Sequence, residues 1–275
     1  VAAGRQQLVI AVAFWFSTAK TREILRDLGR TPGCHVVLYQ TEPPPPAAMA
    51  QKPTLNLSPQ LLAANIQDYN ATEFWDYSKG NLECCYPKGL GVPFRYVPPG
   101  AARALDLGVD LNSSGRQASL MAFMGLWDFR SNKTREFFKN TLGERLEVHS
   151  DVWGAERTRQ FLSQYPVQAN IHKHEDDLDG GSRMPVEAFR LSQLLMNHAC
   201  VISTRSHPSD EAMWKGIVHF ARPGEMTQAF SKVQADVSRC QSDSFQRFTQ
   251  RFSPQKLLRD AGVYSAWLPL LKGKR

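Results

Sequence analysis

Short hydrophobic runs alternate with amphipathic stretches along the first part of the chain. The runs are rich in β-branched and aromatic residues and have the length of strands, whereas the stretch at 18–29 repeats its apolar positions at helical spacing. Ser58 before Pro59, and Ser253 before Pro254, each place a capping hydroxyl and a first-turn proline at a predicted helix start. Strands that alternate with helices are typical of a parallel sheet. The strands predicted in this part cover 8–13, 35–39, 73–77 and 94–98.

The alternation restarts after a stretch rich in Gly, Ala and Ser at 100–115, and we place a domain boundary there. Beyond it, helices are predicted from about residue 132 and from about residue 155. We therefore predict an α/β fold of two Rossmann-like parallel-sheet domains, 1–112 and 113–275, with the C-terminal helices in the second domain. The strands predicted in the second domain cover 119–125, 146–149, 167–172, 199–202 and 217–220.

The segment 186–206 shows one α/β unit in full. Its apolar side chains repeat at intervals of three and four residues, so they share one face of a helix. Glu187 and Arg190 fall in the first turn of this helix, and the pattern ends at Asn197. A short apolar strand follows and ends in Ser203 and Thr204.

Net charge favours anionic partners. The 275-residue chain carries a formal charge of +7, but its lysines and arginines are spread along the sequence, so a phosphate-bearing ligand fits as well as nucleic acid. No apolar run approaches the roughly 20 residues that cross a bilayer. We interpret the run at 8–16 as a buried strand rather than a signal peptide, and we expect a soluble, cytoplasmic protein.

The cysteines predict free thiols. The five residues contain no CxxC pair, and a core of this size needs no covalent staples, so we favour buried thiols in a reducing compartment over a disulfide framework. These cysteines are Cys34, Cys84, Cys85, Cys200 and Cys240.

Candidate chemistry follows the predicted strands, because open parallel sheets bind ligands beyond the carboxyl ends of their strands. Arg130, Lys133 and Arg135 cluster at a predicted helix N-terminus, where backbone amides also attract anions, so we predict a diphosphate site. His172 opens an acidic run that extends to Asp179; a metal site there is the alternative to a solvated loop, and we favour the loop because the acids lack the spacing of a calcium loop.

Six motifs, in this order and spacing, resemble glycosyltransferases of the two-Rossmann-domain (GT-B) architecture, of the family 1 or family 4 type. The resemblance is strongest over 73–222. The motifs are AspTyrSer with AsnLeu at 76–82, ArgTyrValProProGly at 95–100, PheMetGly with Arg130 and Lys133 at 123–133, ValTrpGly with GluArg at 152–157, AsnIleHis at 170–172, and the helix and strand at 186–206.

The resemblance implies transfer of a sugar from a UDP- or GDP-sugar to a glycan, lipid or protein acceptor, with the donor in the second domain and the acceptor in the first. Arg130 and Lys133 would contact the donor diphosphate, and Val152, Trp153 and Gly154 would lie near the base. Further donor contacts are expected from His172, Glu187, Arg190, Ser203 and Thr204. A divalent metal is possible but not expected. Glu187 is also a candidate for catalysis, and Glu42 and Asp76 are the candidates for a general base.

Two positions depart from the pattern. Gln193 stands where many relatives carry a second glutamate, and His198 stands where a glycine is usual. Gln193 and the short first domain leave open a catalytically silent glycosyltransferase-like domain. A sugar-nucleotide epimerase on the same architecture is a further enzyme alternative, which differs in that it needs no acceptor. A basic protein that binds nucleic acid is a further alternative, but only the net charge supports it, so we expect no nucleic-acid partner.

Overall fold

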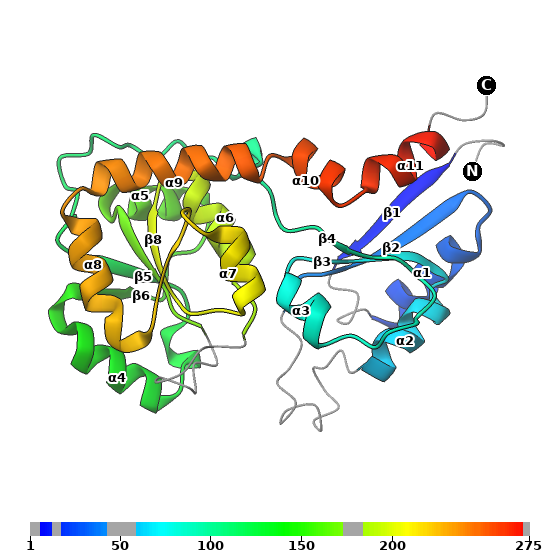
Figure 1. The fold of residues 1–275 in the computed structure, drawn as a ribbon, viewed down its shortest axis with the longest axis horizontal. Coiled ribbons are helices and arrows are strands. Elements are labelled where there is room, and N and C mark those ends of the chain that lie inside the picture. The colour runs from blue at the N-terminus through cyan, green and yellow to red at the C-terminus, as the bar shows by residue number, and fades with distance from the viewer. Residues whose placement is uncertain (1–5, 13–17, 43–58, 173–183, 272–275) are drawn as a thin grey trace. The chain divides into compact units, whose positions relative to one another are not determined.

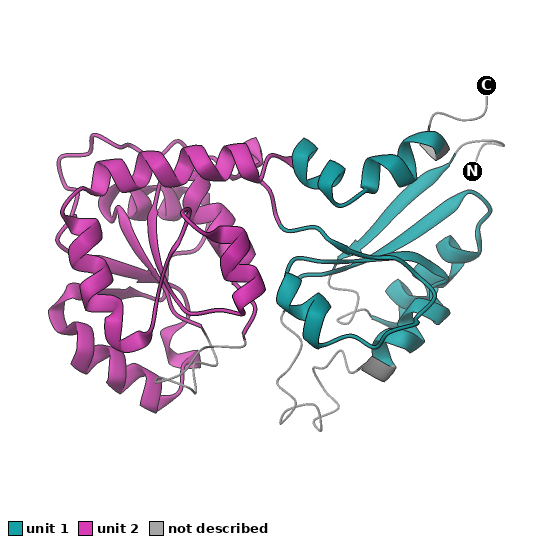
Figure 2. Ribbon diagram, viewed as in Figure 1, with its two compact units in different colours: residues 1–98, 255–275 teal, residues 99–254 magenta. Residues whose placement is uncertain are grey.

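The protein, described here by a computed structural model, folds into two compact α/β units (Figures 1 and 2). The structure describes residues 6–12, 18–42, 59–172 and 184–271. Unit 1 comprises 1–98 together with 255–275, and unit 2 comprises 99–254. The proline run at 43–46, Ser58 and the acidic residues from 173 to 179 lie outside the described residues.

Unit 1 contains a parallel sheet in the order β1-β2-β3-β4. Consecutive strands pair with each other, as expected when each helix returns the chain to the next position along the sheet. The strands are β1 (Gln7–Val12), β2 (Cys34–Gln40), β3 (Ala71–Asp76) and β4 (Phe94–Tyr96). The helices are α1 (Ala19–Arg30), α2 (Pro59–Asp68), α3 (Lys79–Cys84), α10 (Pro254–Asp260) and α11 (Val263–Leu271).

Both faces of the unit 1 sheet are covered, because successive side chains of a strand point to opposite faces. Val36 and Leu38 of β2 pack with Leu25 of α1 and with residues of α2. Val37, one position along, packs with Val263 and Trp267 of α11. The C-terminal helices therefore complete the core of the first unit (Figure 1).

Unit 2 contains a parallel sheet in the order β6-β5-β7-β8-β9. The order reverses between β5 and β7, so the connections of these two strands leave in opposite directions at a topological switch point. The strands are β5 (Met121–Met124), β6 (Leu146–His149), β7 (Val167–Asn170), β8 (Cys200–Thr204) and β9 (His219–Ala221). The helices are α4 (Asn132–Leu142), α5 (Ala155–Gln164), α6 (Ala188–Met196), α7 (Pro208–Trp214), α8 (Met226–Gln234) and α9 (Val237–Arg251). The short 3₁₀ turns are η3 (Arg103–Leu105), η4 (Trp127–Phe129), η5 (Gly143–Arg145) and η6 (Pro223–Glu225).

The predicted α/β class and the predicted strands are confirmed, but the first strand, expected to be buried, lies at the edge of its sheet with Ile10 and Val12 exposed. The unit limits also differ from the expected ones. The first unit ends at Pro98 rather than at 112, and the helices after Pro254 belong to it rather than to the second. The sequence beyond Pro99 is extended chain with a single 3₁₀ turn, and Asn197 fixes it to unit 2 through hydrogen bonds with Leu105 and Leu107. The composition of this segment resembles a linker, but its contacts are those of unit 2.

Candidate donor site

The carboxyl ends of β5 and β7 bring together four charged or polar side chains that are far apart in the sequence. Arg130 follows β5, His172 follows β7, and Glu187 and Arg190 occupy the start of α6. The switch point of the sheet lies between these two strands, where an open α/β sheet is expected to bind its ligand. Four predicted site residues thus meet at the position that the topology favours.

Arg130 is nearly buried, with 5% of its surface exposed. Its Nη1 donates to the carbonyl of Leu126 at 2.9 Å, and its Nη2 donates to the carbonyl of Ile171 at 2.8 Å. The guanidinium also lies 4.6 Å from the ring centroid of Phe123. Its Nε is buried and has no hydrogen-bond acceptor among the described residues. The side chain is therefore held rigidly, with donor capacity left over.

Arg190 lies against the same aromatic ring, 5.4 Å from the centroid of Phe123. Its Nη1 is 3.2 Å from Oε2 of Glu187, one turn earlier on α6, and that nitrogen forms no hydrogen bond of acceptable geometry within the described chain. A Cβ placed on Gly125 would lie 3.3 Å from Nη2 of Arg190, and the φ of Gly125 is +147°. The backbone after β5 approaches the guanidinium closely and has a positive φ, and for both reasons only glycine suits this position.

His172 connects the carboxyl ends of β7 and β8. The residue is buried, its Nε2 lies 2.9 Å from Oγ of Ser206, and its Nδ1 lies 3.8 Å from Oε1 of Glu187. The backbone amide of His172 donates to the Thr204 hydroxyl at 3.4 Å, and Ser203 accepts from Asn170 at 2.9 Å. Ser203 and Thr204 are fully buried, so their hydroxyls hold the ends of the two strands behind His172.

At the switch point, positively charged side chains outnumber negatively charged ones. Burial lowers the pKa of Arg130 to about 10, which leaves it protonated at neutral pH. Burial alone would raise the pKa of Glu187, but the charge of Arg190 and the interaction with His172 outweigh it, and the pKa falls to about 2. Two guanidinium groups therefore face one carboxylate, and the cluster keeps a positive charge that suits a diphosphate.

The other predicted donor residues also lie at the carboxyl ends of the strands of this sheet. Lys133 is exposed in the first turn of α4, which follows β5. Val152, Trp153 and Gly154 lie between β6 and α5; Trp153 is 62% exposed, and its Nε1 donates to the carbonyl of Ser150 at 3.1 Å. An indole held in this way presents a flat surface on which a base could stack.

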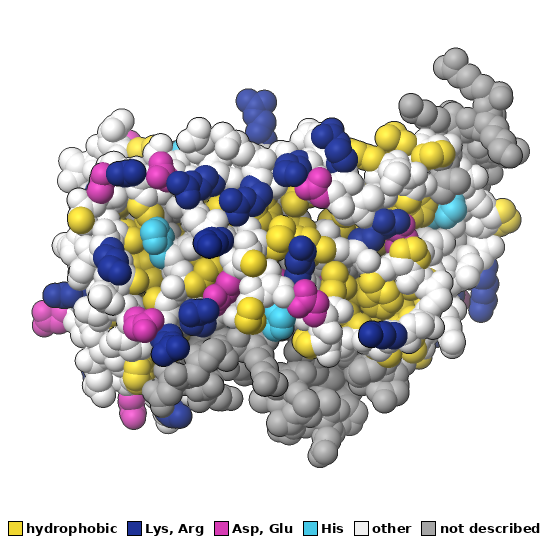
Figure 3. Space-filling view, viewed as in Figure 1, with side chains coloured by type: hydrophobic (Ala, Val, Ile, Leu, Met, Phe, Trp, Pro, Cys, Tyr) yellow, Lys and Arg dark blue, Asp and Glu magenta, His cyan; other side chains and the backbone are white. Residues whose placement is uncertain are grey.

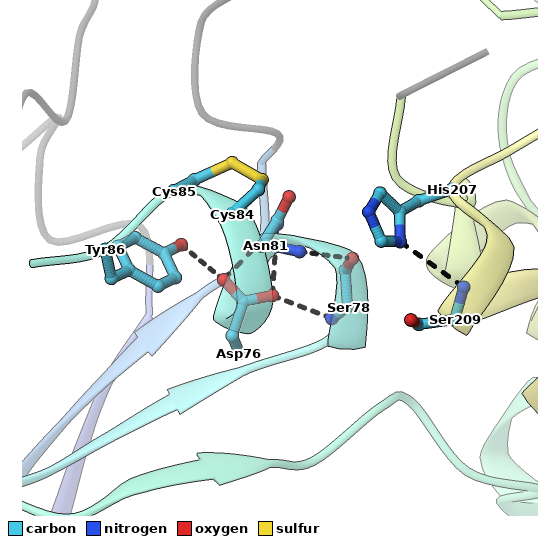
Figure 4. Close-up of a disulfide and its surroundings, with 8 residues drawn as sticks. All are labelled: Asp76, Ser78, Asn81, Cys84, Cys85, Tyr86, His207 and Ser209. Carbon is cyan, nitrogen blue, oxygen red and sulfur yellow. Dashed lines mark hydrogen bonds between the residues drawn. A yellow bond between two sulfur atoms is a disulfide. The ribbon is translucent and has the colours of Figure 1, made fainter. Parts of the chain in front are cut away.

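Asp76 and Glu42, the candidate bases, differ sharply in their surroundings. Asp76 is fully buried at the end of β3 and accepts hydrogen bonds from the amide of Ser78 at 2.7 Å, from Asn81 at 3.1 Å, and from the Tyr86 hydroxyl (Figure 4). Burial and the charge of Asp76 raise the pKa of Tyr86 well above its usual value. Glu42, beyond the end of β2, is exposed.

The prediction of free thiols is wrong for four of the five cysteines. Cys84 is bonded to Cys85 (Figure 4), Cys200 is bonded to Cys240, and only Cys34 is a free, buried thiol. The second pair is separated by 40 residues. Its proximity arises because α9 returns beside the start of β8, which cysteine spacing alone does not show.

Sequence reasoning missed three residues of the cluster. Phe123 supplies the ring beneath both arginines, Gly125 admits Arg190, and Ser206 holds the ring of His172. Phe123 and Gly125 belong to the PheMetGly motif at the end of a predicted strand, so their position was a usable signal. Ser206 had none, because its contact with His172 spans 34 residues.

Lysine and arginine side chains are scattered over the face seen in Figure 3, and acidic groups lie among them. Within the described ranges, none of the helices has the length and apolar character needed to cross a bilayer.

A scan against protein-family models and a search of curated proteins both return no match. Solved structures do match. An α-glucosyltransferase in complex with UDP is 9% identical, with a TM-score of 0.59 over 96% of this chain and 80% of that chain. A pneumococcal O-GlcNAc transferase in complex with UDP and GlcNAc is 11% identical, with a TM-score of 0.52 over 86% and 53%. A glycosylation-associated protein complex from Streptococcus agalactiae is 10% identical, with a TM-score of 0.51 over 93% and 54%.

These likenesses establish the fold. The chain has the two-Rossmann-domain (GT-B) architecture that glycosyltransferases share. It spans most of the α-glucosyltransferase chain but only about half of the length of the other two chains.

Proposed function

We propose that the chain is a glycosyltransferase that transfers a sugar from a nucleoside-diphosphate sugar, bound by unit 2, to an acceptor bound by unit 1. One observation supports this most strongly. At the switch point of a GT-B sheet, the buried Nε of Arg130 has no hydrogen-bond acceptor among the described residues, and Nη1 of Arg190 forms an ion pair with Glu187 but no hydrogen bond of acceptable geometry there. Leaving such donors unpaired costs about 1–3 kcal/mol each, and a diphosphate supplies the missing oxygens.

The arginines also match the chemistry of transfer. As the sugar leaves, negative charge grows on the diphosphate, and fixed positive groups stabilise the transition state more than the ground state. In this proposal, Arg130, Arg190 and Lys133 provide that charge, so no resident metal is required. Glu187 orients Arg190 and the ring of His172, and Trp153 stacks on the base.

UDP is the first nucleotide to test, because two of the similar structures contain it. The acceptor class stays open among glycans, lipids and proteins. For the general base we propose Glu42, which is exposed at the end of a strand, ahead of Asp76, whose buried carboxylate already holds the turn into α3.

Turnover tests the proposal. Release of the nucleoside diphosphate, UDP or GDP, would be measured with a panel of UDP- and GDP-sugars, with and without pooled glycan, lipid and peptide acceptors. We expect acceptor-dependent release that falls about 10²–10³-fold in Arg190→Met, since a lost charge-stabilising group typically costs that much in rate. Lys232→Met, which removes one exposed charge from α8, should leave the rate unchanged. Equal rates in both variants would exclude the assigned role, and UDP binding without release would indicate a silent donor-binding domain.

A further inference from the structure

A second cluster of reactive side chains lies at the opposite end of the unit 2 strands from the donor site. Cys200 is the first residue of β8, His219 is the first residue of β9, and Cys240 lies in the first turns of α9. Their sulfur and nitrogen atoms all lie within 4.8 Å of one another. Ser203 and Thr204 end the same strand β8 at the donor edge, so the cluster takes no part in the proposed transfer reaction.

The fold brings these residues together for definite reasons. β8 and β9 pair in parallel with Ile202 opposite His219, and Cys200 lies two residues before Ile202 on the same face of the sheet. Helix α9 packs on β8, and Cys240 lies against the core that contains Cys200 and Ile202. Three separate elements thus contribute one side chain each.

His219 has the arrangement of a ligand. Its Nε2 lies 3.3 Å from Sγ of Cys240, and this is the hydrogen-bond contact that the structure records for its ring. A disulfide sulfur is a weak acceptor, so it gives little reason for an imidazole to point at it. Two thiolates and an imidazole nitrogen are the ligands that zinc prefers, whereas disulfide sulfurs are not.

We propose that Cys200, His219 and Cys240 bind a zinc ion when the two cysteines are reduced, and that the disulfide is the oxidised, metal-free state of the same site. In tetrahedral zinc sites, neighbouring ligand atoms are about 3.5–3.8 Å apart, given Zn–S near 2.3 Å and Zn–N near 2.0 Å. The observed separations, within 4.8 Å, require only small side-chain shifts. His219 is exposed, so the ion enters from that side and water completes the coordination.

Reduction followed by metal binding converts the disulfide state into the zinc state. A dithiol reductant attacks the disulfide, the bond between the two protein sulfurs breaks, both become thiols, and the reductant closes to its own disulfide. Zinc then replaces the two thiol protons, which are released to solvent, and binds the neutral imidazole of His219. In the reverse direction, a disulfide oxidant accepts two electrons from the two thiolates and is itself reduced to thiols, the bond between Cys200 and Cys240 forms again, and the ion is released. The site would therefore keep α9 attached to β8 in either redox state, through the disulfide in one and through the ion in the other, and only the ion would also attach β9 through His219.

Cobalt(II) serves as the spectroscopic probe. The experiment uses the full chain with Cys84→Ser and Cys85→Ser, so that the other cysteine pair cannot bind metal. This protein is reduced with dithiothreitol, desalted without oxygen, and titrated with Co²⁺. We expect one equivalent to bind, with thiolate-to-cobalt charge-transfer absorption and the strong visible bands of tetrahedral cobalt, and no binding to the oxidised chain.

Two variants decide the outcome. His219→Ala keeps both cysteines and the disulfide, and it should weaken binding at least tenfold; Cys240→Ser should abolish the charge-transfer band. Cys34→Ser, the matched control at a buried free thiol, should bind as the parent does. Zinc should also raise the melting temperature of the reduced parent but not of His219→Ala. A reduced, folded parent that binds no cobalt, or His219→Ala that binds as tightly as the parent, would overturn the proposal.

Discussion

Arg130 and Arg190 destabilise the folded protein when no ligand is bound. Each has one buried guanidinium nitrogen that forms no hydrogen bond among the described residues, although that of Arg190 is ion-paired with Glu187, and both lie over the ring of Phe123, where desolvation strengthens the cation–π contact. Burial of this kind destabilises the free chain and favours a ligand that supplies oxygen atoms. The arrangement therefore serves binding rather than stability.

Glu187 makes the stability of unit 2 depend on pH. Its pKa in the folded chain is about 2, below the ordinary 4.5. A carboxyl group whose pKa is lowered by folding stabilises the folded state fully at any pH above its pKa in the unfolded chain. This contribution to the free energy of unfolding is lost as the pH falls through the pKa of the folded chain. In Glu187→Gln, the free energy of unfolding should therefore decrease less between about pH 5 and about pH 2 than in the parent chain. Urea unfolding at stepped pH measures this difference, and parallel curves would contradict it.

Individual site residues were predictable where a sequence rule applied to them. Arg130, His172, Glu187 and Arg190 follow strands or open a helix, and the carboxyl-end rule selects such positions. Burial was not predictable. Asp76 lies at a strand end as expected, yet its carboxylate is fully buried and accepts four hydrogen bonds from three neighbouring residues, Ser78, Asn81 and Tyr86.

Helix α6 contributes site residues at its start and packing contacts at its end. Its start carries Glu187 and Arg190, and its end is closed by Asn197 and His198. His198 has a φ of +56°, the left-handed conformation that glycine adopts most easily, which explains why a glycine is usual at this position. The imidazole stacks on Phe245 of α9 at 3.9 Å, a contact that glycine cannot make.

Arg95 connects β4 to β3 and to the turn between α10 and α11. It donates to both carboxylate oxygens of Glu73, at 2.7 and 2.8 Å, and to the carbonyl of Ala261 at 2.7 Å. Burial raises the pKa of Glu73, but the hydrogen bonds from Arg95 and Trp75 outweigh this and lower it overall. Glu73 is thus held as a carboxylate inside unit 1.

Removal of Arg95 should therefore leave a buried charge unpaired. We expect Arg95→Met to lower the free energy of unfolding by about 3–5 kcal/mol, and the double variant Arg95→Met with Glu73→Gln to lose less, because a neutral amide costs less to bury. Arg26→Met breaks the exposed pair with Asp68 in the same unit and should cost less than about 1 kcal/mol. Denaturant unfolding of the four proteins checks this order; equal losses for Arg95→Met and Arg26→Met would contradict it.

At the scale of the whole molecule, the sequence predicts two parallel-sheet units but not their limits. Helices α10 and α11 follow unit 2 in the sequence but pack in unit 1. No local sequence pattern shows that the chain returns to its first unit. The strand order β6-β5-β7-β8-β9 is equally hidden, because it depends on which strands pair rather than on where they occur. The position of the donor site follows from that order.

In the proposed function, the switch point of unit 2 binds a diphosphate through Arg130 and Arg190. Calorimetric titration with UDP and with uridine tests it directly, since the two ligands share the base and ribose but only UDP carries phosphates. We predict that UDP binds much more tightly than uridine, and that Arg190→Met weakens UDP about 10–100-fold, the effect of about 1.5–3 kcal/mol for a charged hydrogen bond. Uridine should be unaffected, and Lys232→Met should bind as the parent does. Equal affinities for UDP and uridine, or an unchanged UDP affinity in Arg190→Met, would contradict the assignment.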